Sequence, residues 1–264
     1  MKRIIILSTV VFILSSFVQN QKTPSDCYIA NNSFQPGEKL TYKIAFKWGA
    51  IWLSAGEATF NLENSTYNNK PCLHAIGYGA TYRSYDWFFK VRDKYESYFD
   101  SEAMTPYKFV RDVNEGGYSL YNNVTFNHKA GKATSTNGTF DIPEGSQDVL
   151  SAVYYMRCID INKYKVNDTI PIKIFLDDKN YPLYVRYIGK EELNTKAGKF
   201  KCIVIKPLLI SGTIFKGGEE MKVYVTDDAN KIPVRISSPI LIGEIMCELV
   251  SYSGLRNEIT SKLK

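Results

Sequence analysis

The chain has few of the residues on which most enzyme chemistry depends. Its 264 residues include only two histidines, His74 and His128, and neither has a cysteine or a second histidine at a metal-ligand spacing. The sequence contains no Gly-x-Ser-x-Gly turn, no Cys-x-x-Cys pair and no phosphate-binding glycine loop. A nucleophile needs a base and an orienting group, and two histidines leave few choices of base. We therefore expect a protein that is not an enzyme, with no catalytic residue, no metal and no cofactor.

Long apolar runs are also scarce, because the only one lies at the N-terminus. Two positive charges, Lys2 and Arg3, precede an apolar run over 4–18. That run is shorter than the roughly 20 residues that cross a bilayer, so it is typical of a signal peptide. We place the cleaved signal peptide at 1–21 and a leader at 22–36. No later run predicts a transmembrane segment, and we expect an exported, periplasmic or cell-envelope protein.

Charge of one sign is not concentrated anywhere. The net charge is +6, and the lysines and arginines are scattered along the chain. A scattered basic surface favours a solvated exterior over a nucleic-acid surface, and export argues further against nucleic acid. The partners that remain are a lipid, a glycan or another envelope protein.

Aromatic residues are abundant, with 19 Tyr and 14 Phe, and they favour strands. Residues 39–48 alternate strictly between apolar and other side chains, which predicts a half-buried strand. Turn residues separate many further runs of this kind. The pattern predicts an all-β fold in which an antiparallel sheet curves into a barrel or half-barrel, with a sandwich as the alternative. Further strands are expected at 51–63, 70–78, 88–99, 107–113, 118–127, 183–193, 200–207, 219–226, 234–237 and 245–251.

One segment departs from the strand pattern. Apolar residues recur near helical spacing over 146–159, after Pro143 and Gly145. We expect one short helix there, with Ser146 as its N-cap. The helix is expected to cover an open end of the sheet and to bury Val149, Val153 and Met156.

The two sides of this helix resemble each other. Residues 37–44 (GEKLTYKI) match 167–174 (NDTIPIKI), and the same offset aligns Cys72 with Cys202. A slightly smaller offset aligns 99–106 with 226–233. Three matches in the same order predict two pseudo-repeats, 37–127 and 167–252, within a single β-domain over 37–254, followed by a polar tail at 255–264. Cys72 and Cys202 should each be buried on a strand.

The spelling of several turns and strands resembles a bacterial family of exported proteins, domain of unknown function 3108. The segments that carry the resemblance are 36–42 (PGEKLTY), 55–58 (AGEA), 195–202 (TKAGKFKC) and 225–234 (VTDDANKIPV). The resemblance spans nearly the whole chain after the signal peptide. It implies an envelope location and an all-β fold, and it provides no catalytic residues to carry over.

The most unusual local composition is the aromatic run over 78–99, which is interleaved with arginine and aspartate. Such rings commonly fill the core of a large β-domain. They also suit a cleft for an apolar or sugar-like ligand, because Tyr and Trp combine a flat apolar face with a polar group. On this second interpretation the candidate ligand-binding residues are Tyr82, Arg83, Tyr85, Trp87 and Arg92.

Three hypotheses for function follow. The first is a non-catalytic exported protein that binds a hydrophobic or amphiphilic ligand, or an envelope partner, in the concavity of the curved sheet. The second is a structural or interaction module without a ligand pocket. The third and weakest is a carbohydrate-active enzyme, which would need two carboxylates facing each other across a groove. A large apolar cavity would favour the first hypothesis and a filled core the second.

Overall fold

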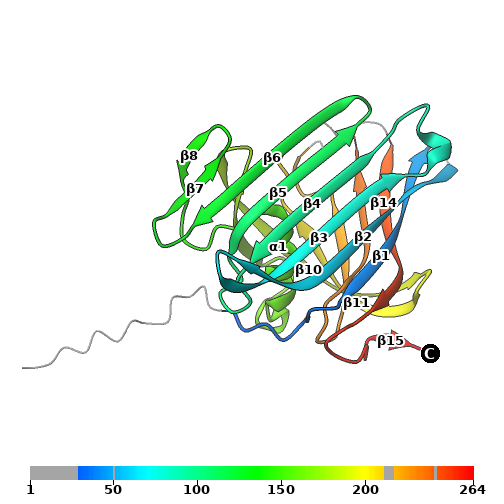
Figure 1. The fold of residues 1–264 in the computed structure, drawn as a ribbon. Coiled ribbons are helices and arrows are strands. Elements are labelled where there is room, and N and C mark those ends of the chain that lie inside the picture. The colour runs from blue at the N-terminus through cyan, green and yellow to red at the C-terminus, as the bar shows by residue number, and fades with distance from the viewer. Residues whose placement is uncertain (1–28, 50, 211–216, 241–242) are drawn as a thin grey trace, which may run out of the picture.

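The structure is a computed structural model that describes residues 29–49, 51–210, 217–240 and 243–264. The expected signal peptide at 1–21 and the first part of the leader lie outside the described residues. One antiparallel sheet of 15 strands accounts for most of the chain (Figure 1). The strands are β1 (Lys39–Trp48), β2 (Ile51–Tyr67), β3 (Lys70–Thr81), β4 (Arg92–Phe99), β5 (Pro106–Glu115), β6 (Tyr118–Asn127), β7 (Lys132–Ser135), β8 (Gly138–Asp141), β9 (Thr169–Leu176), β10 (Lys179–Thr195), β11 (Gly198–Pro207), β12 (Lys222–Thr226), β13 (Pro233–Pro239), β14 (Glu244–Ser253) and β15 (Lys262–Leu263).

The sheet is curved and does not close. Its order is β8-β7-β6-β5-β4-β3-β2-β1-β14-β13-β12-β11-β10-β9, with β15 paired to β11. The antiparallel pair β1–β14 joins the two chain-ordered groups of strands at the middle. The free edge of β9 is covered by a loop, since Gln147 N donates to Lys173 O at 2.8 Å and Phe175 N donates to Gln147 O at 2.9 Å. The all-β, barrel-like prediction is confirmed.

Tight turns set much of this topology. The β2–β3 hairpin turns through Asn68 and Asn69, both with positive φ, which matches the primed turns that fit the twist of β-hairpins. Asp177 and Asp178 do the same between β9 and β10. Because consecutive strands are joined in this way, most neighbours in the chain are also neighbours in the sheet.

Eight strands precede the helical segment and seven follow it; the repeat hypothesis concerns the first six of each group, β1–β6 and β9–β14. The second strands of the two groups, β2 and β10, have 17 residues each. Pro106 and Pro233 both begin the fifth strand of their group, and Leu40 and Ile170 are both the second residue of the first strand. These equivalences are those that the repeat hypothesis requires, while a three-dimensional superposition of 37–127 on 167–252 stays a prediction. Cys72 and Cys202 are buried on β3 and β11, as predicted.

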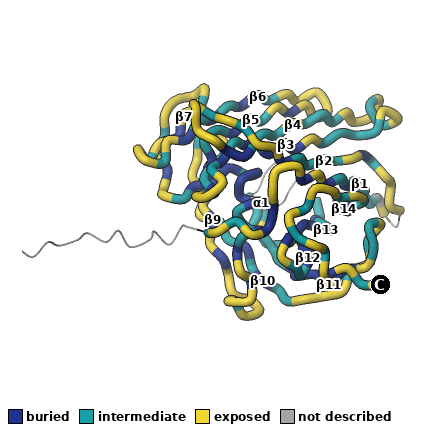
Figure 2. Tube along the Cα trace, turned by 60° about the horizontal axis from the view of Figure 1, so that its bottom comes forward, coloured by how far each residue is buried: buried dark blue, intermediate teal, exposed yellow. Residues whose placement is uncertain are grey.

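The helix α1 (Val149–Cys158) lies inside the curve of the sheet (Figure 2) and contacts β3, β4 and β9. Its N-cap is Asp148, so the prediction of Ser146 was wrong. The Asp148 carboxylate accepts hydrogen bonds from Leu150 N and Ser151 N. Ser146 lies two residues earlier in the chain and does not reach these two N–H groups. The predicted buried face was right in part. Val149 and Met156 are partly buried and pack against core residues, whereas Val153 is exposed. The fully buried side chains are Leu150, Tyr154 and Arg157, because Phe34, Phe99 and Glu38 pack on that side.

Several segments expected to be peripheral are part of the packed structure. Phe34, within the expected leader, is fully buried in the main core cluster. The expected polar tail at 255–264 contributes β15, and its residues Leu255 and Ile259 pack against a second core cluster. Two short strands, β7 and β8, have no counterpart among the predicted strands, and β4 begins at Arg92 because a 3-10 turn, η1 (Arg83–Tyr85), precedes it. A second 3-10 turn, η2 (Ile161–Lys163), follows α1.

A candidate ligand-binding face inside the curved sheet

The end of the sheet that holds α1, called here the helix end, is densely packed. Rings from the N-terminal segment, β4 and α1 meet there, with Phe34–Tyr154 centroids 4.9 Å apart and Phe99–Tyr154 centroids 5.5 Å apart. Both phenylalanines are fully buried. The helix therefore fills the concave face at this end.

A buried ion pair ties the helix end together. Arg157 on α1 donates to both carboxylate oxygens of Glu38 at 2.6 and 2.7 Å, and both side chains are almost completely buried. Arg157 also donates to Asn230 O at 3.1 Å, in the loop between β12 and β13. Its own carbonyl accepts from Ser33 Oγ at 2.7 Å. One arginine thus connects the N-terminal strands, the helix and the C-terminal strands.

The dense packing on the concave face ends between two adjacent rows of side chains, each row running across neighbouring strands. In the first row Tyr42 is paired with Leu249, and both are buried. In the next row Ile44, Cys247, Ile236 and Val223 are neighbours across β1, β14, β13 and β12. All four are only partly buried although they are apolar or weakly polar. On β1 and β14 the concave face is therefore covered at the first row and reached by solvent at the second.

Two glycines on β3 show the same transition from packed to open. Gly77 and Gly79 share the face of the core residues Leu73 and Ala75. A Cβ built on Gly77 would lie 3.1 Å from the Phe60 ring and 3.9 Å from Tyr95 Cβ, whereas one built on Gly79 meets no atom within 4 Å. Gly79 pairs with Ala58 on one side and Asp93 on the other. We call the surface formed by Ile44, Ala58, Gly79, Asp93, Ile236 and Cys247 the open concave face.

A polar group borders the open concave face on β4 and β5. Glu115 and Asp93 share a hydrogen bond between their carboxyl groups, and Asn114 N donates to Asp93 at 3.0 Å. Burial, followed by this hydrogen bond and the charge of Asp93, raises the pKa of Glu115 to about 7. Burial likewise raises the pKa of Tyr95, which shares their face, to about 12. Below about pH 7 the Glu115 carboxyl is therefore mostly protonated, and the pair carries less negative charge than two carboxylates would.

A second ion pair joins β5 to the turn at the far edge of the sheet. Arg111 on β5 donates to Asp177, in the turn between β9 and β10. The Arg111 side chain is 12% exposed, and its Nε has no hydrogen-bond partner among the described residues. The border of the open concave face can thus form hydrogen bonds with a polar group of a ligand, while the rows on β1, β13 and β14 are apolar. This combination suits an amphiphile.

The predicted site residues all lie in or beside the loop that joins β3 to β4, at the end of the sheet opposite α1. Tyr82 Oη donates to Glu57 at 3.2 Å, and Tyr85 is half-buried in η1. Arg92 pairs with Asp86 at 2.8 Å and donates to Thr81 O at 3.1 Å, so it braces the loop. Arg83 and Trp87 point into solvent, and Trp87 is 85% exposed. The structure brings these five residues together in one loop, and their role in ligand binding stays a prediction.

The sequence analysis did not predict the residues of the open concave face. Strand parity could have indicated them, because it places Gly79 on the same face as Leu73, and Asp93 on the same face as Phe99, toward the core. Glu115 and Arg111 have the parity of the core residues Phe109 and Val113 in the same way. A charged or glycine position within a core-facing row is the pattern that should have drawn attention.

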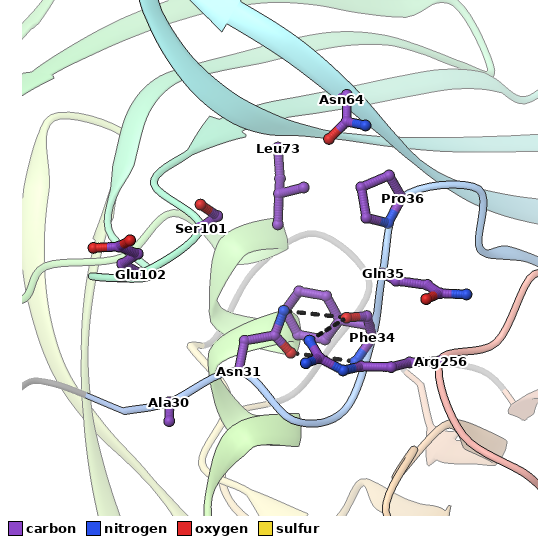
Figure 3. Close-up of a pocket in the computed structure, with 10 residues that line it drawn as sticks. All are labelled: Ala30, Asn31, Phe34, Gln35, Pro36, Asn64, Leu73, Ser101, Glu102 and Arg256. Atoms are coloured by element: carbon purple, nitrogen blue, oxygen red, sulfur yellow. Dashed lines mark hydrogen bonds between the residues drawn. The ribbon is translucent and has the colours of Figure 1, made fainter.

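A separate hollow lies at the helix end (Figure 3). It has a volume of about 360 Å³ and is bounded by the N-terminal segment, by Asn64 and Leu73 of the sheet, and by Ser101 and Glu102 of the next turn. Its polar groups are largely bonded within the protein. Asn31 Nδ2 donates to Phe34 O at 3.1 Å, and Arg256 Nη1 donates to the same oxygen at 3.4 Å. The described residues contain no group of three or more metal-ligating side chains, here or elsewhere.

Comparison with known proteins identifies both a similar fold and the family of the chain. The structure resembles a β-barrel-like protein of domain of unknown function DUF1849 from Brucella abortus, with a TM-score of 0.55, 9% identity, and coverage of 84% of this chain and 99% of that one. At this identity the likeness concerns the fold alone. The sequence matches the family model of protein of unknown function DUF3108 over residues 41–250, and the chain therefore belongs to that family. The predicted family is confirmed.

Two more distant solved structures were also found. One is a "putative lipoprotein" from Parabacteroides distasonis, with a TM-score of 0.35, 13% identity, and coverage of 86% of this chain and 100% of that one. The other is a "putative exported protein with YmcC-like fold" from Bacteroides fragilis, with a TM-score of 0.32, 10% identity, and coverage of 86% and 99%. No curated protein matches the sequence. Within the part of the chain that the structure describes, no helix has the length and hydrophobicity of a membrane span.

Proposed function

We propose that this protein is a non-catalytic, exported binding protein that takes a hydrophobic or amphiphilic molecule on the open concave face. The observation that carries the proposal is the space above Gly79, beside the half-buried row of Ile44, Cys247 and Ile236. Apolar surface left in water costs about 25 cal/mol per Å², so a bound apolar chain would stabilise this face. The polar border formed by Glu115 and Arg111 would then meet the headgroup of the ligand.

The arrangement of the carboxylates supports binding over glycoside hydrolysis. Glycosidase pairs are about 5–10 Å apart, with the sugar between them. Asp93 and Glu115 instead bond directly to each other. Export is supported by the N-terminal apolar run after Lys2 and Arg3.

The experiment is a titration of the folded chain, beginning after the proposed signal peptide, with the neutral probe N-phenyl-1-naphthylamine. We expect a saturable rise in fluorescence that dodecan-1-ol reverses. Gly79→Trp should abolish saturable binding, because the indole would occupy the open space, and Gly79→Leu should weaken it. Tyr78→Trp is the matched control, since Tyr78 is the adjacent residue on the outer face and is 43% exposed.

The melting temperature of each variant shows whether it is folded. Loss of binding in folded Gly79→Trp, with binding kept in Tyr78→Trp, would support the proposal. Non-saturable binding by the unmodified chain, or equal binding by Gly79→Trp and Tyr78→Trp, would contradict it. In that case a module without a ligand site would be the better description.

A further inference from the structure

The end of the sheet opposite α1 carries an unusual amount of exposed apolar side chain. Six residues form what we call the apolar rim, three from the β1–β2 hairpin and three from the β3–β4 loop. Trp87, Phe88 and Ile51 are 85%, 73% and 64% exposed. The complete set is Ile51, Trp52, Leu53, Trp87, Phe88 and Phe89. Isolated exposed apolar residues are ordinary, whereas six in two adjoining loops mark an interaction surface.

The two loops are held side by side and the rings are held outward. Tyr82 N donates to Ala55 O at 3.0 Å, which joins the start of the β3–β4 loop to β2 (Figure 1). Within the loop, Phe88 N and Phe89 N both donate to Tyr85 O at 2.9 Å. The Arg92–Asp86 pair closes the base of the loop. Trp87 and Phe88, with centroids 5.8 Å apart, therefore project from an ordered turn.

Charge at the rim is positive. Arg83 and Lys90 flank Trp87 and Phe88 in the same loop, both are exposed, and neither has an ion-pair partner among the described residues. Lys47 lies 5.6 Å from the centre of the Trp52 ring and 3.7 Å from Glu244. Asp86 is already neutralised by Arg92. Two free cations beside exposed Trp and Phe are the combination that binds the interface of a membrane with anionic lipids.

We propose that the apolar rim docks the protein on an anionic lipid bilayer. The indole and phenyl groups would lie at the level of the lipid headgroups, where amphipathic rings are most stable. Arg83 and Lys90 would contact the lipid phosphates. The apolar rim and the open concave face consist of different residues, so this inference is independent of the proposed ligand.

The test is sedimentation of the folded chain with vesicles of phosphatidylcholine containing 30% phosphatidylglycerol, compared with phosphatidylcholine alone. We expect binding to the anionic vesicles and a loss of roughly fivefold in affinity for each of Arg83→Gln and Lys90→Gln. The double variant Trp87→Ala/Phe88→Ala should lose at least about tenfold. The matched control is Tyr121→Ala/Val166→Ala, which removes two side chains of 60% and 55% exposure outside the rim.

A second measurement separates the bilayer from other occupants. Binding should shift the tryptophan emission to the blue, and lipids brominated near the headgroup should quench it. No binding to anionic vesicles, or equal binding by the rim and control variants, would overturn the proposal. A concentration-dependent dimer that the rim variants abolish, in protein that does not bind vesicles, would also overturn it and would assign the rim to a second copy of the chain.

Discussion

The two ends of the curved sheet are built on opposite principles. At the helix end the concave face is filled by aromatic rings, and its buried charges, Arg157 and Glu38, are paired at 2.6 and 2.7 Å. At the opposite end the same face lacks bulk above Gly79, and the connecting loops expose Trp87 and Phe88. Among the described residues, it is at the helix end that aromatic rings pack densely on the concave face. Stability is therefore expected to be concentrated at the helix end, and the opposite end is where we propose that binding occurs.

The largest expected effect comes from removing the buried arginine. Arg157→Met leaves Glu38 as an unpaired buried carboxylate, and we expect a loss of about 3–5 kcal/mol in the free energy of unfolding. That loss would be a large part of the total stability of a domain. Urea denaturation followed by circular dichroism measures it.

A second arginine provides the control. Arg186→Met removes a partly exposed pair with Glu219, which water still reaches, and should change stability less than Arg157→Met. If the two variants were equally stable, the helix end would not be where stability is concentrated.

Loss of the helix cap should have the next largest effect. Asp148 is fully buried and accepts from Leu150 N at 2.7 Å, Ser151 N at 2.8 Å and Ser97 Oγ at 2.6 Å. Asp148→Ala leaves these donors unpaired, and a loss of about 2–3 kcal/mol follows. Asp148→Asn keeps an oxygen for the two backbone donors and should lose less. An alanine variant as stable as the asparagine variant would show that the cap is unimportant.

The boundary between the two ends can be measured with one side chain at two positions. Gly77→Val crowds Phe60 and Tyr95 and should cost about 1–2 kcal/mol. Gly79→Val enters open space and should change stability by less than about 0.5 kcal/mol. Thermal unfolding of both variants is sufficient for the comparison. Equal destabilisation would place packed atoms above Gly79 and remove the boundary.

The smallest effect is a dependence of stability on pH. The pKa of Glu115 in the folded protein, about 7, lies above the ordinary value of 4.5. Folding therefore favours the protonated form, so this contribution is fully present below about pH 4.5 and is lost as the pH rises through 7. Glu115→Gln should flatten the fall in melting temperature between pH 5 and 8, whereas Glu63→Gln, on the exposed side of β2, should not. An unchanged slope in Glu115→Gln would contradict the raised pKa of Glu115.

Much of the fold could be predicted from the sequence because strand periodicity is a local property. The limits of β1 and β6 were predicted to the residue, since alternation and turn residues mark both ends. The limits of the helix were approximately right, and Val149 and Met156 pack against the core as predicted, but Val153 is exposed and the fully buried residues were not predicted. Which face a short helix buries depends on partners distant in sequence, here Phe34, Phe99 and Glu38, and no local pattern identifies them.

The candidate site was harder to predict for a related physical reason. Composition drew attention to the aromatic run over 78–99, yet its members separate by strand parity and by loop. Phe99 is buried in the core and Tyr95 packs against it, while Trp87 is exposed on the apolar rim. The open concave face exists because Gly79 and Ala58 have no large side chain to fill it. Only the register of four strands places these two small residues beside Ile44 and Cys247. The sequence shows each residue, but not that their side chains leave a space together.

Binding on the open concave face is tested most directly by a crystal structure of the folded chain grown with 12-bromododecan-1-ol, because bromine is located by its anomalous scattering. We expect a bromine peak on the open concave face, next to Gly79 and Ile44, with the alkyl chain beside Cys247 and Ile236. A peak found only outside the sheet, or a structure in which side chains close the space above Gly79, would contradict binding at this face.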